Sequence, residues 1–364
     1  MTSRAAAPCR ATRSFLLVVR ALFTLLVVAG CTGAPEGSGP AFGPPEGDTA
    51  EEVVMARADW RSGFLQAAIV RQLIDELGYE VSELAERTYP PETAYPLLGR
   101  GELDLWANGW FPLHEPFLEQ ERVTGQRVPY PIEPVGTLVP AGAVQGYLID
   151  RESAEELGIT SMGDLARPEI AAMFDHDGDG RADLYGCDVG WGCHGTIIEH
   201  LEQHAWGDTV EQVSGVYRDL FEEVRQRIDA GQPTLFYTWT PNWTVAVLEP
   251  GVDVVWLEVP ALAGEDPPPS VSGLEGCAGP DPCQLGWEVN DIRSVANTGF
   301  LDAHPPIRRL LEVVEIPVDD LAEQHARMVA EEPYPEDQIE RDAATWIDQN
   351  RDLVDRWLRA ARDA

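Results

Sequence analysis

Strand-like and helix-like apolar patterns alternate along the chain from residue 51 onward, and this alternation constrains the fold more than any other feature. Residues 51–58 predict a short strand, and residues 64–77 predict a helix because their apolar side chains recur at helical spacing. Further strands are expected at residues 103–110, 144–150, 234–239, 253–259 and 291–296. Further helices are expected at residues 153–157, 195–206 and 217–230, from about 241, and over most of the chain after 300. This pattern predicts an α/β protein in two lobes.

The overall composition excludes some classes of protein. The chain has 364 residues, of which 44% are hydrophobic, so it can bury a sizeable core. Its 62 acidic residues against 26 basic ones give a formal net charge of −36, which makes nucleic acid an unfavourable partner. The proline-rich stretch at residues 264–282 predicts a long surface loop.

The first thirty residues have the pattern of a secretory signal peptide. Four arginines precede a mostly apolar run at residues 21–28, which is shorter than the roughly 20 residues that a membrane span needs. Small residues before Cys31 resemble a bacterial lipobox, so we expect lipid on Cys31, with plain secretion as the alternative. Residues 31–50 then form the lipidated cysteine and a glycine- and proline-rich tether. This predicts an extracytoplasmic protein anchored to a membrane by lipid.

The remaining cysteines fall into two pairs with equal spacing. Removal of Cys9 with the signal peptide, and lipidation of Cys31, leave Cys187 with Cys193 and Cys277 with Cys283. In an oxidising compartment both pairs are expected to form disulfides. A four-cysteine metal site is the alternative, but two C-x5-C pairs do not have the usual spacing of zinc ligands.

Three short segments concentrate tryptophans in turns that follow strands or open helices. They are residues 110–114, 187–195 and 237–243. Strand ends and turns carry ligand-binding side chains on a rigid support, although packing in the core is an alternative role for these tryptophans. Tryptophan faces attract cations, and quaternary ammonium groups most of all. Sugars also stack on tryptophan, but these segments offer few of the polar side chains that a sugar requires.

The second segment also predicts an anion site. Residues 191–195 precede a helix expected from about Thr196, and the free amides at a helix start favour carboxylates. His114 can add a side-chain donor, and glycine at position 192 permits close approach of the backbone. A quaternary ammonium at one end and a carboxylate at the other define a betaine.

At these segments the chain resembles the periplasmic glycine betaine/proline betaine-binding proteins of ABC transporters, the ProX type. The matching stretches include GELDLWANGWFPLHEP and LFYTWTPNWTVAVLEPGVDVVWLEVP, and the resemblance covers nearly the whole mature chain. It implies a tryptophan box around the ammonium group and a separate clamp on the carboxylate. The box residues are Trp110, Trp191 and Trp239. The clamp residues are His114 and the backbone amides of Gly192 and Cys193.

The resemblance has further implications. It implies the type II periplasmic-binding-protein fold, in which two α/β lobes close on a ligand cleft by a hinge. Lobe 1 would comprise residues 51–142 and 286–364, and lobe 2 residues 143–285. The family disulfide maps to Cys187 and Cys193. The expected partners are a betaine and the ABC permease with its ATPase. The expected protein is a monomer with no catalytic residues, cofactor or bound metal.

Three other features have alternatives that stay open. Residues 175–183 place acids at positions 1, 3, 5 and 9 of a calcium-binding loop, but Gly186 stands where the bidentate glutamate belongs, so a solvated Asx-rich turn is the other interpretation. His200 and His204 are four residues apart, but the H-E-x-x-H order of zinc-binding helices is absent, which favours a surface helix face over a metal site. A sugar-binding lipoprotein or a secreted carbohydrate-active enzyme remains the second function class, with Glu115 as its nearest carboxylate to the tryptophans.

Overall fold

The computed structural model describes residues 52–262, 264, 269–331 and 334–364. The signal peptide, the lipid-bearing Cys31 and the tether expected from the sequence lie outside the described residues. Within the part of the chain that is described, no helix is both long and apolar enough to cross a membrane.

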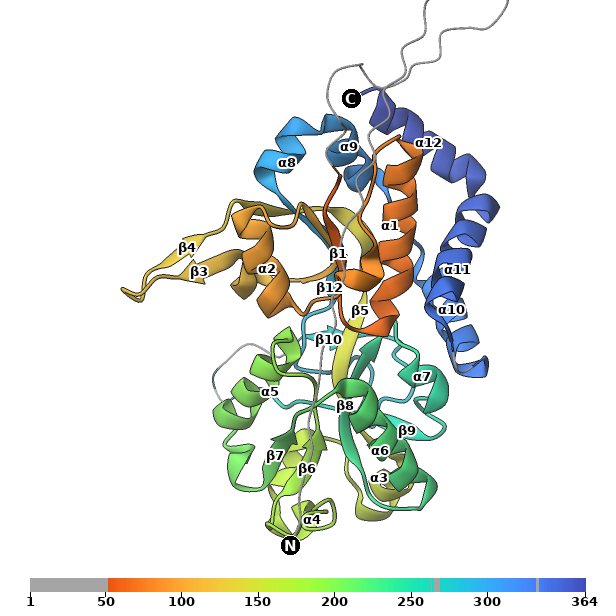
Figure 1. Cartoon of the computed structure of the whole chain (residues 1–364). Helices are drawn as coiled ribbons and strands as arrows, with labels where there is room; N and C mark the ends of the chain where they lie inside the picture. The colour runs from red at the N-terminus through yellow and green to blue at the C-terminus, as the bar shows by residue number, and fades with distance from the viewer. Residues whose placement is uncertain (1–51, 263, 265–268, 332–333) are drawn as a thin grey trace, which may run out of the picture. The chain divides into compact units, whose positions relative to one another are not determined.

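The body is mixed α/β, as the sequence predicts (Figure 1). The strands are β1 (Met55–Arg57), β2 (Leu105–Phe111), β3 (Glu119–Glu121), β4 (Arg127–Pro129), β5 (Ile132–Asp150), β6 (Ala182–Tyr185), β7 (Val210–Val213), β8 (Leu235–Thr240), β9 (Val254–Leu257), β10 (Ser270–Val271), β11 (Cys283–Gln284) and β12 (Asn290–Asn297). The helices are α1 (Phe64–Glu76), α2 (Pro91–Arg100), α3 (Arg151–Leu157), α4 (Pro168–Ala171), α5 (Gly192–Gln203), α6 (Tyr217–Asp229), α7 (Thr244–Val247), α8 (Thr298–Ala303), α9 (Pro305–Val313), α10 (Val318–Ala330), α11 (Glu336–Gln349) and α12 (Arg351–Arg362).

The long strand β5 links two halves of the main sheet. The strand order is β1-β2-β12-β5-β8-β6-β7, and β9 also pairs with β5. Residues 132–143 of β5 pair with β12, whereas residues 144–150 pair with β8 and β9. Figure 1 shows β5 in yellow, passing from the strands β1 and β12 toward β8 and β9. One continuous strand therefore connects the strands β1, β2 and β12 with the strands β6, β7, β8 and β9. The tryptophan segments are distributed over both of these sets.

Helices α1 and α2 show why local sequence produces these elements. Leu73 and Ile74 of α1 are fully buried, and α1 packs against β2 on one side and α11 on the other. Helix α2 begins at Pro91, where a missing N–H costs nothing. It ends at Gly101, whose φ of 70° suits the left-handed position that terminates a helix.

Several predicted elements are confirmed with small changes in their ends. They are β1, β2, β8, β9, β12, α1, α3, α6 and the helical C-terminal region. Strand β5 was predicted only from residue 144 but begins at Ile132. Pro134, Gly136 and Pro140 interrupt the apolar alternation in its first half, and register shifts in its pairing with β12 accommodate them.

Three other expectations need correction. Helix α5 begins at Gly192 rather than near Thr196. The helix expected from about Pro241 is a single turn that begins at Thr244. The expected surface loop at 264–282 contains β10, whose Ser270 and Val271 pair with β11. Short or glycine-rich segments carry too little periodicity to fix their ends.

Candidate ligand-binding site

One cavity brings the three tryptophan segments together. All six residues predicted from the sequence to bind the ligand line it, and four others join them. The predicted residues in its wall are Trp110, His114, Trp191, Gly192, Cys193 and Trp239. The additional residues are Trp60, Leu113, Gln145 and Tyr237.

Four tryptophans form the apolar walls of this cavity. The ring centroids of Trp110 and Trp239 are 6.4 Å apart, and the planes meet at 89°. Trp191 lies 5.7 Å from Trp239 at 79°, and Trp60 lies 5.2 Å from Trp191 at 74°. Each of the four side chains is only 4–7% exposed. Indoles at nearly right angles to one another present several aromatic faces to one small volume.

Hydrogen bonds from the indole N–H groups hold these rings in place. Trp60 and Trp110 both donate to Oδ1 of the buried Asn108, at 2.7 and 2.9 Å. Trp239 donates to Ser62 Oγ at 3.2 Å. Because these indole N–H groups are already bonded to acceptors of the protein, the rings offer a ligand in the cavity their aromatic faces rather than hydrogen bonds.

The indole of Trp191 is held by a carboxylate from the segment that follows β1. Trp191 Nε1 donates to Asp59 Oδ1 at 2.8 Å. Burial, followed by the nearby Asp188 carboxylate, raises the pKa of Asp59 to about 6. The hydrogen bond from Trp191 acts in the opposite direction and favours the ionised form. This bond joins the turn before α5 to residues that follow β1.

His114 is positioned as a neutral hydrogen-bond donor. The backbone N–H of Trp110 donates to His114 Nδ1 at 3.1 Å, so Nδ1 carries no proton, and the hydroxyl of Tyr95 lies 3.2 Å from the same nitrogen. The ring is 2% exposed, and burial lowers the pKa of His114 to about 3. At neutral pH the proton of this tautomer is therefore on Nε2.

The first turn of α5 supplies backbone donors beside this histidine. Gly192 and Cys193 are the first two residues of α5, and Trp191 is its N-cap. Amides at these positions have no acceptor within the helix, and they lie at the positive end of its dipole. A Cβ on Gly192 would lie 2.8 Å from Leu113 Cγ and 3.3 Å from His114 Cδ2. Only glycine lets α5 approach the histidine this closely.

Both expected disulfides are present. Cys187 is bonded to Cys193, and the closed loop contains Trp191 and the start of α5. Cys277 is bonded to Cys283 with the same sequence separation of six residues. The first bond therefore braces the loop that carries both an aromatic wall and the backbone donors.

Sequence reasoning missed four of the cavity residues. Trp60 lies three residues after the end of β1, and this position is a signal for it, because the ends of strands in an α/β sheet commonly carry ligand-binding residues. Gln145 lies opposite Trp239 in the β5–β8 register, which no local pattern reveals. Tyr237 stands two residues before Trp239 on the same face of β8, and Leu113 packs beside Gly192.

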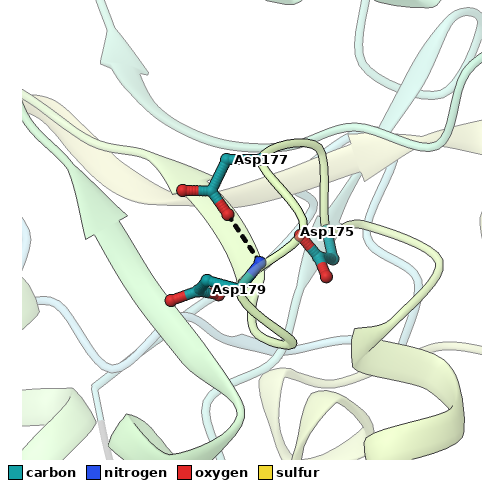
Figure 2. A group of neighbouring side chains, drawn as sticks. All are labelled: Asp175, Asp177 and Asp179. Carbon is teal, nitrogen blue, oxygen red and sulfur yellow. Dashed lines mark hydrogen bonds between the residues drawn. The ribbon is translucent and has the colours of Figure 1, made fainter.

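The acidic loop at residues 175–183 lies apart from this cavity. Figure 2 shows Asp175, Asp177 and Asp179, whose carboxylate oxygens lie within 4.8 Å of one another and could hold a metal ion. The same oxygens accept backbone hydrogen bonds within the turn: Asp175 from Gly178 and Gly180, and Asp177 from the N–H of Asp179. Both interpretations of the loop are compatible with this arrangement.

The surface helix face predicted for His200 is wrong. His200 is buried, its Nδ1 lies 2.8 Å from the hydroxyl of Tyr147, and its ring packs on Trp287. His204 is partly buried and stacks on Trp206. Burial lowers the pKa of His200 to about 4, which keeps the ring neutral. The helix turns this histidine toward the core because it lies on the same face as Ile197 and Leu201.

The fold and the cavity define a class of protein that encloses a small ligand between parts of an α/β body. Comparisons with solved structures show the fold of type II periplasmic binding proteins. A choline-binding protein of an ABC transporter, solved with choline, has a TM-score of 0.61 at 18% identity and matches 86% of this chain and 94% of its own. Lactococcal OpuAC, solved closed with glycine betaine, has a TM-score of 0.60 at 15% identity and matches 85% of this chain and 99% of its own.

Sequence comparisons narrow the class to a family. Residues 51–349 match the model of the substrate-binding domain of ABC-type glycine betaine transport systems, and the chain belongs to that family. The glycine betaine-binding periplasmic protein OusX of Dickeya dadantii is 35% identical over 301 residues, which are 82% of this chain and 86% of OusX. The glycine betaine/proline betaine-binding periplasmic protein of Salmonella typhimurium is 30% identical over 351 residues, 96% and 98% of the two chains.

Proposed function

We propose that this protein is the extracytoplasmic substrate-binding component of an ABC transporter and that it captures glycine betaine or proline betaine for the permease. The observation that carries the proposal is one cavity with four tryptophan walls beside the first-turn amides of a helix and a neutral histidine. The two relatives named for binding glycine betaine or proline betaine support the same conclusion.

The aromatic walls suit the cationic half of a betaine. A quaternary ammonium has no N–H to donate, so hydrogen-bonding side chains cannot select it, whereas indole faces attract it through their quadrupoles. Each desolvated contact contributes about 1–2 kcal/mol, so three or four supply a large part of the roughly 8 kcal/mol that micromolar affinity requires. We propose Trp110, Trp191 and Trp239 as this box, with Trp60 as a further wall.

The carboxylate half fits the donors at the other side of the box. The amides of Gly192 and Cys193 and Nε2 of His114 are each able to donate, and the helix dipole favours an anion at this point. Hydrogen bonds to a charged group contribute about 1.5–3 kcal/mol each. A neutral His114 suits this role because it binds the anion without the cost of burying a second charge.

Capture and delivery require a hinge and an address outside the cytoplasm. We propose that residues 51–142 with 286–364 form lobe 1, that residues 143–285 form lobe 2, and that β5 crosses between them. The bonds from Trp191 to Asp59 and from Trp239 to Ser62 then join the lobes in the closed state. We also propose a signal peptide at 1–30, lipid at Cys31, and a monomer that docks on the permease without catalytic residues.

The second candidate is a sugar-binding lipoprotein or a carbohydrate-active enzyme. Tryptophan stacking is its only support from this cavity. The cavity wall contains no carboxylate side chain among the described residues, and Glu115 is exposed outside it. Since a glycosidase needs two carboxyl groups across the scissile bond, this geometry favours betaine capture.

Calorimetry with four ligands tests the proposed function. The chain from residue 32 onward is titrated separately with glycine betaine, proline betaine, choline and maltose. Micromolar binding of both betaines, with much weaker choline binding, supports the box and the carboxylate clamp together. Equal binding of choline contradicts the clamp, and binding of maltose alone contradicts the function.

A further inference from the structure

Gln145 places an unpaired hydrogen-bond donor in the wall of the cavity. The side chain comes from β5 and is 1% exposed. Its Oε1 accepts a hydrogen bond of 2.7 Å from the hydroxyl of Tyr237, which fixes the amide. Its Nε2 is buried and has no partner among the described residues. Nearly every buried amide nitrogen in a protein is hydrogen-bonded, so this one is prepared for a partner that enters the cavity.

We infer that Gln145 donates from Nε2 to the carboxylate of the bound ligand, an inference that rests on the proposed function. A quaternary ammonium offers no acceptor, and the positive end of an N–H dipole repels a cation. Of the two ends of a betaine, only the carboxylate can therefore satisfy this donor. Gln145 lies opposite Trp239 in the strand register and shares the cavity wall with Cys193.

A carboxylate can accept as many hydrogen bonds as the cavity wall has donors for it, if Gln145 is included. An ionised carboxylate has about four lone-pair sites, and the amides of Gly192 and Cys193 with Nε2 of His114 occupy three. Nε2 of Gln145 is the fourth donor in the cavity wall. Gln145 thus acts as a specificity-determining residue, because a cation that lacks the carboxylate leaves a buried donor unpaired.

A glutamine-to-methionine substitution at two positions tests this role. Gln145→Met removes the donor with little change of shape, and Gln66→Met is the matched control. Gln66 is also 1% exposed and has an unpartnered polar atom, but it lies in α1 outside the cavity wall. Calorimetry with glycine betaine is expected to show at least a tenfold loss of affinity for Gln145→Met and a change below threefold for Gln66→Met.

The outcomes separate this inference from the proposed function. If the wild-type protein binds glycine betaine and Gln145→Met loses less than tenfold in affinity, the inference is overturned while the function stands. If the wild-type protein binds no betaine, both are overturned. Should Gln145→Met fail to melt cooperatively, Gln145→Met is combined with Tyr237→Phe, which removes the hydroxyl that has lost its acceptor, and Tyr237→Phe alone is the reference. An affinity at least tenfold below that reference supports the inference, and a smaller loss overturns it.

Discussion

At the scale of single residues, Gly192 shows how closely the start of α5 approaches the segment that carries His114. The position of its missing Cβ lies 2.8 Å from Leu113 Cγ and 3.3 Å from His114 Cδ2. These distances are shorter than ordinary van der Waals contacts. A methyl group at this position would displace Leu113 first and would press on His114, so the donor geometry depends on its absence.

Gly192→Ala is expected to lower the affinity for glycine betaine by roughly tenfold or more, because overpacking of about 1–3 kcal/mol displaces the donors. Gly195→Ala is the control. It lies on the same helix, and a Cβ there meets no atom within 4 Å. Titration calorimetry on both variants checks the prediction. Equal affinities in the two variants would mean that the close approach does not serve binding.

At the scale of elements, the loop before α5 joins binding to local rigidity. The Cys187–Cys193 bond closes a loop that contains Trp191 and the first two residues of α5. The Cys277–Cys283 bond closes a loop of the same length that does not line the cavity. Closing such a short loop stabilises a protein by about 2 kcal/mol through the entropy of the unfolded chain. The two disulfides are therefore expected to contribute equally to the stability of the fold, whereas only the Cys187–Cys193 bond is expected to affect ligand binding.

Replacing both cysteines of either pair with alanine separates these effects. Each double variant is expected to lose about 2 kcal/mol of unfolding free energy. Only the variant at 187 and 193 is expected to bind glycine betaine several-fold more weakly, because it must order the loop on binding. Denaturant unfolding and calorimetry provide the two readouts. Loss of affinity in the variant at 277 and 283 would contradict this division of roles.

Individual helices and strands also show how far the sequence predicts the structure. Short apolar runs identify β2, β8 and β12, and clustering of tryptophans in turns identifies three segments that meet in the cavity. The family resemblance, rather than the clustering, selects six residues within these segments. The first half of β5 was missed because its prolines and glycine break the pattern. The start of α5 was missed because Gly192, Cys193 and Gly195 have poor helix propensity. The role of Gln145 depends on strand register, which only the folded sheet defines.

At the scale of the whole molecule, buried titratable groups link stability to pH. Burial lowers the pKa of His114 to about 3 and those of His200 and His325 to about 4, from a reference value of 6.5. Between pH 6.5 and 4 the unfolded chain therefore binds more protons, and acidification lowers stability. Asp59 opposes this effect, because its pKa is raised to about 6, and the stability that it contributes is lost as pH rises through 6.

Together these four groups take up about two protons on unfolding near pH 5, from three histidines less one aspartate. The free energy of unfolding should then fall on acidification from pH 6.5 by about 1.4 kcal/mol per pH unit for each proton. His325→Gln should reduce the uptake by about one. Denaturant unfolding between pH 5 and 7 measures this slope. A stability that is flat or rises on acidification would contradict the assignment of neutral buried histidines.

The central claim is that indole faces hold the cationic ligand, and the affinity of Trp191→Ala for glycine betaine tests it most directly. Trp346→Ala is the matched control, since Trp346 is equally buried, at 7% exposure, but stacks on Trp357 outside the cavity. The loss of one desolvated cation–π contact, which contributes about 1–2 kcal/mol, predicts an affinity about 5- to 30-fold lower for Trp191→Ala. The affinity of Trp346→Ala is expected to stay near the wild-type value. Wild-type affinity in a folded Trp191→Ala protein would contradict the tryptophan box.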